Sequence, residues 1–135
     1  MVGELYRDEF GAITHDQENG ILELGWLEGS ASMTDDDFMR SMERYAEFAE
    51  ARRPANLLVD VTRFRHSPGE DVGPWRDQHI IPRYNAAGVK KFAFLFPPGA
   101  PGTVEAGSEP RREPPGTFPT GYFADRQHIL DWFGR

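Results

Sequence analysis

Two apolar runs constrain the fold more than any other feature of the sequence. Residues 56–61 read NLLVDV and residues 91–96 read KFAFLF, so both are apolar on either face of an extended chain. A half-exposed strand alternates apolar and polar residues, whereas a strand covered on both sides is apolar almost throughout. The two runs therefore predict an α/β fold in which they are neighbouring buried strands of a parallel or mixed sheet.

The N-terminal part of the sequence predicts a hairpin. Residues 5–15 are interpreted as a first, weakly patterned strand, and residues 21–27 as a second. Between them, Asn19 and Gly20 form a strong turn signal, because both residue types tolerate a positive φ. The two strands should pair antiparallel. One face of the second strand carries Leu22, Leu24 and Trp26 by the two-residue period.

A long amphipathic helix is expected from residue 34 to about Arg53. Thr34 can cap the free N–H groups of the first turn, and the three acids at residues 35–37 suit the positive end of the helix dipole. These acids lack the ligand spacing, central Gly and closing Glu of a calcium loop, so we interpret them as part of the cap. Pro54 should end the helix. Its buried stripe is expected at Phe38, Met42, Tyr45 and Ala49.

Helical segments are also expected between the two apolar strands and at the C-terminal end. Pro82 should break or bend the first of them, whose apolar members are Val72, Trp75, Ile80, Ile81 and Tyr84. Residues 121–123 are interpreted as a short strand, and Asp125 as the cap of the last helix. That helix should pack inward through Ile129, Leu130, Trp132 and Phe133.

Residues 97–119 are rich in Pro and Gly, with almost nothing apolar before Phe118. They predict a long loop without regular structure, either a disordered segment or a functional lid. Residues 99–115 should then contribute little to stability. The complete prediction is a single α/β domain over residues 1–135. Its mixed sheet has four to five strands and an N-terminal hairpin, with helices packed on the sheet.

Composition argues against several classes of function. The formal net charge of −7 repels phosphate groups, so neither nucleic acid nor an anionic membrane is an expected partner. The chain has no cysteine, its four histidines are scattered without metal-ligand spacing, and it carries no cofactor fingerprint. We therefore expect no metal and no cofactor. The apolar runs are far shorter than the roughly 20 residues of a membrane span. No signal-peptide core is present, so a cytoplasmic location without membrane insertion is expected.

The order of these elements resembles the bacterial STAS-like proteins, a group that includes the anti-sigma-factor antagonists. The resemblance is carried by a hairpin ending in Trp26, an amphipathic helix, a strand ending Leu-Val-Asp and the closing pattern Tyr-Phe-x-Asp-x-x-x-x-Leu-x-Trp-Phe. It implies a non-catalytic regulatory or scaffold module that binds a protein partner or a small ligand. Two features depart from the family. The Pro-rich loop takes the place of a helix, and Ser67 is the nearest residue to the family's phosphorylated Ser or Thr.

The candidate site lies where the first apolar strand ends. Asp60 is near the carboxyl end of that strand, where open α/β sheets place their ligands, and Arg63, Arg65, His66 and Ser67 follow it. A small anion could be held there by charge-assisted hydrogen bonds. The structural alternative is a capping box running from Ser67 to Glu70, with Asp60 either paired to an arginine or accepting from backbone N–H groups.

Three alternatives stay open from the sequence. A small hydrolase-like enzyme would use Asp60 and His66, although adjacent His and Ser side chains rarely reach triad geometry, so no catalytic residue is assigned. A homodimer would use an edge strand or a helix face. Finally, Tyr84, Trp75, Trp26 and the phenylalanines either line an apolar pocket under the long loop or simply pack the core.

Overall fold

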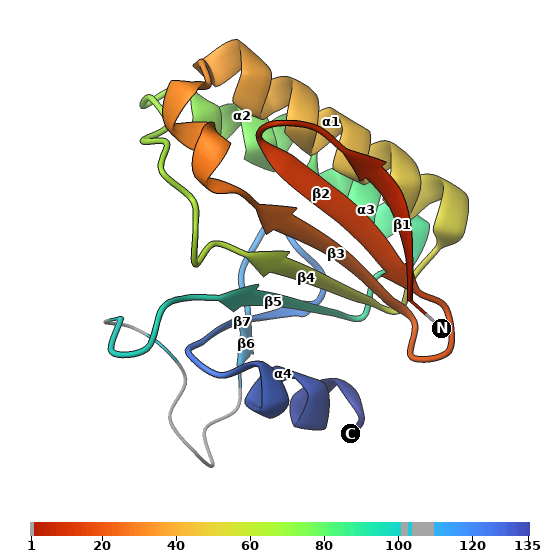
Figure 1. Ribbon diagram of the computed structural model, residues 1–135. Coiled ribbons are helices and arrows are strands. Elements are labelled where there is room, and N and C mark those ends of the chain that lie inside the picture. Colours follow the sequence, from red (N-terminus) through yellow and green to blue (C-terminus); the bar gives the residue numbers. More distant parts are fainter. Residues whose placement is uncertain (1, 101–102, 104–109) are drawn as a thin grey trace.

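A mixed β-sheet lies at the centre of the computed structural model, which describes residues 2–100, 103 and 110–135 (Figure 1). The strands are β1 (Val2–Arg7), β2 (Gly11–Asp16), β3 (Ile21–Trp26), β4 (Asn56–Asp60), β5 (Lys91–Leu95), β6 (Arg111–Arg112) and β7 (Pro119–Phe123). They lie in the order β1-β2-β3-β4-β5-β7-β6. The α/β fold and the mixed sheet are confirmed. The expected four to five strands were too few, because the described residues form a 7-stranded sheet.

The middle of the sheet is parallel and its margins are antiparallel. β3, β4, β5 and β7 pair parallel to one another in that order. β1 and β2 pair antiparallel on one side, as do β2 and β3, while β6 pairs antiparallel with β7 on the other. The two apolar runs are thus adjacent strands, as predicted. Their register pairs Leu57 with Phe92 and Val59 with Phe94.

Helices cover both faces of the sheet and explain why its central strands are apolar throughout. The helices are α1 (Asp35–Arg52), α2 (Val72–His79), α3 (Ile81–Ala87) and α4 (Arg126–Phe133), with a short 3-10 helix, η1, at Glu28–Ser32. Figure 1 shows α4 on the face opposite α1, α2 and α3. Leu57 and Val59 of β4 join the core beneath α1 and α3, whereas Leu58 packs with Ile129 and Trp132 of α4. Alternate residues of one strand therefore serve two cores.

Helix α1 begins and ends as its sequence predicts. The Thr34 hydroxyl accepts from the Asp37 N–H, and the Asp37 carboxylate accepts from the Thr34 N–H, which completes a capping box. Arg53 adopts a left-handed conformation at the other end, directly before Pro54. The expected stripe is also present, with Met42, Tyr45 and Ala49 buried and Phe38 partly buried.

The single strand expected at residues 5–15 is in fact two strands, β1 and β2. Asp8 causes the difference, because its Oδ1 accepts from the N–H groups of Phe10 (2.9 Å) and Gly11 (3.0 Å) and so closes a turn. A side chain that satisfies two backbone donors in this way competes with continued strand pairing. The hairpin expected across Gly20 is confirmed as β2–β3.

The Pro-rich stretch at 97–119 is more ordered than predicted where it is described. Arg111 and Arg112 pair with β7 as the short strand β6, and β7 itself begins at Pro119. Phe118 is only 2% exposed. The expectation that residues 99–115 contribute little to stability falls partly on 101–102 and 104–109, which lie outside the described residues.

The capping box predicted from Ser67 to Glu70 is wrong. Helix α2 begins at Val72 with Asp71 as its N-cap residue, and residues 64–69 are not helical. Pro74 supplies the physical reason. It has no N–H, so it fits only in the first turn of a helix, and a helix begun near Ser67 would place it beyond that turn.

The remaining helices follow the sequence with one exception. The helical segment breaks at Ile80, and Pro82 lies at the start of α3, as expected. The Asp125 side chain accepts from the Gln127 N–H and caps α4. Ile129 and Trp132 are buried there, but Leu130 is 38% exposed and so was wrongly placed in the core.

Two substitutions test which of two residues, Thr34 or Ser67, caps a helix. Thr34→Ala should lower the free energy of unfolding by about 1 kcal/mol, because it removes the hydroxyl of a complete capping box. Ser67→Ala should change it by less than about 0.5 kcal/mol, because Ser67 is exposed and lies outside the helix. Urea unfolding followed by circular dichroism gives both values. A larger loss for Ser67→Ala than for Thr34→Ala would contradict this assignment.

Candidate functional site

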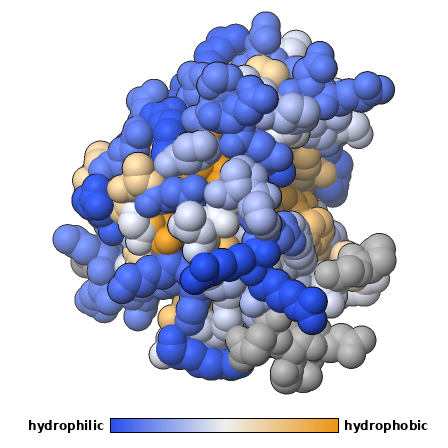
Figure 2. Space-filling view, turned by 180° about the vertical axis from the view of Figure 1, so that it is seen from behind, coloured by the Kyte–Doolittle hydropathy of each residue, from blue (hydrophilic) through white to orange (hydrophobic). Residues whose placement is uncertain are grey.

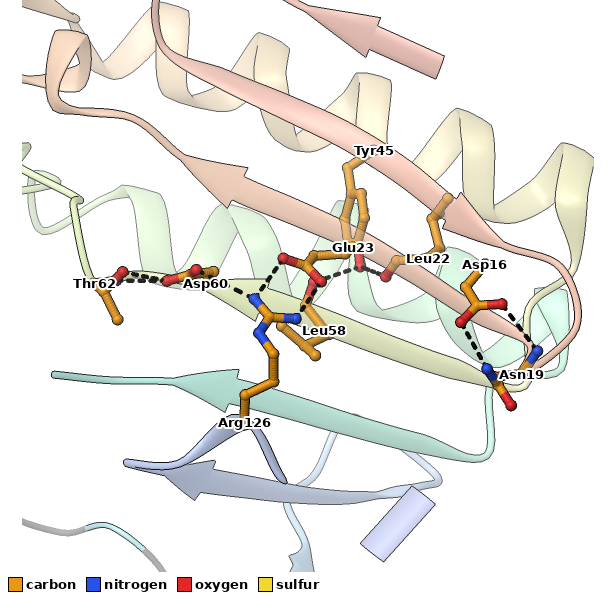
Figure 3. A network of polar contacts seen from close by, with 9 residues as sticks. All are labelled: Asp16, Asn19, Leu22, Glu23, Tyr45, Leu58, Asp60, Thr62 and Arg126. Atoms are coloured by element: carbon orange, nitrogen blue, oxygen red, sulfur yellow. Dashed lines mark hydrogen bonds and ion pairs between the residues drawn. The ribbon is translucent and has the colours of Figure 1, made fainter. Parts of the chain in front are cut away.

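Asp60, the first of the predicted site residues, is engaged in contacts within the protein. Its Oδ1 accepts from the N–H of Thr62 (2.9 Å) and from the Thr62 hydroxyl (2.6 Å), and its Oδ2 lies 3.4 Å from Arg126 (Figure 3). The carboxylate therefore shapes the turn after β4 and contacts α4. The structural alternative for Asp60 is therefore confirmed in both forms, because the carboxylate pairs with Arg126 and accepts from the Thr62 N–H.

Arg126 connects α4 to the sheet. Its two terminal nitrogens donate to the two carboxylate oxygens of Glu23 on β3 at 2.7 and 2.9 Å, in the bidentate geometry that suits this pair (Figure 3). These hydrogen bonds raise the pKa of Arg126 above its ordinary value. The cluster of Asp60, Glu23 and Arg126 is thus an ion-pair network that joins the start of α4 to β3 and β4.

His66 belongs to the loop between β4 and α2, and its side chain lies against α1. Its Nε2 is 2.8 Å from Oδ1 of Asp35, and the Gly69 N–H contacts both oxygens of that carboxylate at 3.2 Å. The imidazole also packs against the rings of Phe38 and Phe64, with centroid distances of 5.9 and 6.1 Å. Asp35, in the first turn of α1, therefore anchors residues 66–69.

The other predicted site residues do not converge with Asp60 and His66. Arg63, Arg65 and Ser67 are exposed. Arg65 donates its backbone N–H to the buried Ser30 hydroxyl at 2.8 Å and its guanidinium to the Phe64 carbonyl at 3.3 Å. Among the described residues, no hydrogen bond or ion pair joins the groups of this loop into one site.

A cavity of about 550 Å³ lies instead between the sheet and the layer of α1, α2 and α3. Figure 2 views the molecule from behind the sheet of Figure 1, and hydrophobic side chains show there through gaps between hydrophilic ones. Aromatic rings dominate the cavity wall. They belong to Trp26, Phe38, Phe64, Tyr84, Phe92, Phe94, Phe96, Phe118 and Tyr122.

Several of these rings are stacked in parallel. Phe94 of β5 stacks on Phe92 with a centroid distance of 4.7 Å, and on Tyr122 of β7 at 5.4 Å. Trp26 of β3 stacks on Phe38 of α1 at 5.3 Å. The alternation of β5 places Phe92 and Phe94 on one face of the sheet, and the parallel register places Tyr122 beside them.

Residues 113–118 form one wall of the cavity and are tied down at two points. The Asn85 side chain donates to the Pro115 carbonyl (3.0 Å) and accepts from the Thr117 N–H (2.9 Å). The Tyr122 hydroxyl donates to the Glu113 carboxylate at 2.7 Å. Burial and this carboxylate raise the pKa of Tyr122 to about 12. The wall is therefore part of the folded structure.

Two residues that line the cavity each carry a fully buried side-chain atom with no hydrogen-bond partner among the described residues. These atoms are the hydroxyl of Tyr84, whose side chain is 0% exposed, and Nε of Arg76. Burial raises the pKa of Tyr84 and keeps its hydroxyl protonated. Tyr45 makes the contrast clear, because its buried hydroxyl lies 2.6 Å from the Leu22 carbonyl and 3.2 Å from that of Leu58 (Figure 3).

The sequence predicted some of the residues that line this cavity. Tyr84, Trp26 and most of the phenylalanines line it, as the pocket hypothesis expects. Trp75 does not line it and packs beside His79 at a centroid distance of 6.2 Å. Arg76, Glu113 and the 113–118 wall were missed. The period-two spacing of Phe92, Phe94 and Phe96 signals an aromatic face, but it does not distinguish a packed face from a hollow one.

Comparisons of the chain with protein-family profiles, with curated proteins and with solved structures find no significant match. Across residues 2–100, 103 and 110–135, no three His, Asp or Glu side chains gather closely enough to hold a metal ion. Within the same ranges, no helix combines the length and apolar character needed to cross a bilayer.

The two buried tyrosines give a matched test of the unpartnered hydroxyl. Tyr45→Phe should lower the free energy of unfolding by about 1 kcal/mol, because it removes a satisfied buried hydrogen bond. Tyr84→Phe should leave it unchanged or raise it, because the lost hydroxyl has no partner. Both values come from urea unfolding of the ligand-free protein. A loss for Tyr84→Phe as large as that for Tyr45→Phe would show that the Tyr84 hydroxyl is satisfied.

Proposed function

We propose that this protein is a non-catalytic regulatory module that binds a small, largely apolar ligand in the cavity between its sheet and α1–α3. The cavity itself carries the proposal. Its volume of about 550 Å³ falls in the range of small-molecule sites, which are mostly apolar with a few placed polar groups. The ring-lined wall with Arg76, Tyr84 and Glu113 has this composition.

The cavity is built from rigid parts, which favours binding. Val59 and Phe94 come from central strands, Met42 from α1 and Ile81 from α3, while the Asn85 contacts hold the outer wall. A site that is already formed does not lose conformational entropy when a ligand enters. Protein interiors are normally close-packed, so an unfilled apolar space of this size is more than core packing alone explains.

The geometry gives little support to the hydrolase alternative. Asp60 contacts Thr62 and Arg126 on the α4 side, and His66 contacts Asp35 on the α1 side. A nucleophile and its base must lie within hydrogen-bond reach of each other, and these two candidates have separate partners. The resemblance of the sequence to STAS-like proteins likewise favours a regulatory role over a catalytic one.

A matched pair of tryptophan substitutions tests the proposal. Thr120 on β7 lines the cavity, and Thr120→Trp should fill part of it. Thr14 on β2 is also a half-buried strand residue but does not line the cavity, so Thr14→Trp is the control. The probe is N-phenyl-1-naphthylamine, a neutral dye whose fluorescence rises in apolar surroundings.

Wild type and Thr14→Trp should bind the dye alike, and Thr120→Trp should bind it at least about tenfold more weakly, because filling the cavity removes apolar contacts with the dye. Thermal melts followed by circular dichroism verify that each variant is folded. No binding by wild type, or equal binding by folded Thr120→Trp, would contradict the proposal.

A further inference from the structure

The charged side chains of the cavity wall indicate which charge its ligand carries. Arg76, Asp77 and Glu113 are the charged residues that line the cavity. Arg76 and Asp77 form an ion pair at 3.5 Å, so their charges offset each other. Glu113 has no cationic partner among the described residues, where its carboxylate accepts from the neutral Tyr122 hydroxyl. The cavity wall therefore carries an uncompensated negative charge.

The Glu113 carboxylate is accessible to a ligand and has a defined place on the wall. Its residue is exposed and also lines the cavity, so it lies where the cavity meets solvent. The Tyr122 hydroxyl donates to it at 2.7 Å, and this hydroxyl stays protonated because its pKa is raised to about 12. The carboxylate is thus held beside the Tyr122 ring.

Three aromatic rings of the cavity wall gather around this position. Phe94, Phe96 and Tyr122 are half-buried and line the cavity, and the Tyr122 centroid lies 5.4 Å from that of Phe94 and 6.0 Å from that of Phe96. Phe96 is inclined by 41° to Phe94 and by 47° to Tyr122, so neither of these rings stacks on its face. The face of an aromatic ring is negative and attracts a cation within about 6 Å of the centroid.

The carboxylate and the rings therefore favour the same charge on the ligand. The formal net charge of −7 acts in the same direction, because it raises the concentration of cations near the surface. A strongly hydrated inorganic ion would leave the apolar wall unused. An alkylammonium group is weakly hydrated, so it can lie against the rings while the rest of the molecule fills the apolar space.

We infer that the cavity binds a small organic cation of the alkylammonium class, with its charge against the Phe96 and Tyr122 rings beside Glu113 and its apolar body within the ring-lined space. The inference rests on the proposed function, since it names the ligand class of that same cavity. It assigns affinity for the apolar body to the cavity as a whole, and selectivity for positive charge to Glu113 and the ring faces.

The test compares three matched ligands by their displacement of N-phenyl-1-naphthylamine. (2-Naphthylmethyl)trimethylammonium is the cation, and 2-neopentylnaphthalene is its neutral isostere, with carbon in place of nitrogen. 2-Naphthylacetate is an anion on the same ring system. Wild type should bind the cation at least as tightly as the more hydrophobic isostere, and about tenfold more tightly than the anion, because ring faces and a carboxylate attract only the cation.

Two variants separate recognition of charge from general affinity, measured as the ratio of cation affinity to isostere affinity. Glu113→Gln keeps an acceptor for Tyr122 but removes the charge, so it should lower this ratio about fivefold. Phe96→Leu keeps an apolar side chain but removes the ring, so it should lower the ratio about threefold. Glu28→Gln removes an exposed charge outside the cavity and should leave the ratio unchanged. Thermal melts followed by circular dichroism verify that each variant is folded.

Three results would overturn the inference. They are weaker binding of the cation than of the isostere by wild type, binding of the anion as tight as that of the cation, and a ratio that Glu113→Gln changes no more than Glu28→Gln does. In each case the dye still binds to wild type, whereas failure of the proposed function abolishes dye binding itself.

Discussion

Burial of β4 on both faces is the constraint on which the rest of the structure depends. Leu57 and Val59 need a cover on one side and Leu58 on the other, so helices must pack against both faces of the sheet. α1 provides the first cover and fixes it with the Tyr45 hydroxyl, which contacts carbonyls of β3 and β4. α4 provides the second, and Arg126 ties it to the same two strands. The cluster of Glu23, Asp60 and Arg126 thus has a structural role.

The cavity follows from how far the helix layer extends across the sheet. α1 and α3 pack over β3 and β4, and the strands β5 and β7 lie beyond the middle of that layer (Figure 1). Phe94, Phe96 and Tyr122 remain only half buried there. Residues 113–118 close the side of this space and are held by Asn85, which leaves a hollow lined by rings. The cavity is thus formed at the edge of the hydrophobic core by residues of this domain alone.

The sequence predicted the parts of this structure that depend on local chemistry. Two-sided apolarity identified β4 and β5, and Thr34 with its acids identified the start of α1. The errors have equally local causes, since Asp8 and Pro74 each carry a signal that was not used. The cavity could not be predicted in the same way. Whether the rings of β5 fill their space or surround a hollow depends on the distance between layers. It also depends on contacts between residues far apart in sequence, such as Asn85 with Pro115, which are 30 residues apart and join the 113–118 wall to α3.

Intermolecular nuclear Overhauser effects between N-phenyl-1-naphthylamine and methyl-labelled protein test the central claim, that the cavity binds an apolar ligand, most directly. The methyl groups of Val59, Val61, Ile81 and Met42 line the cavity, whereas those of Ile21 and Ile129 belong to the core on the α4 face. The account predicts ligand contacts to the first set and none to the second. Contacts to Ile21 and Ile129, or contacts spread evenly over both faces, would contradict it.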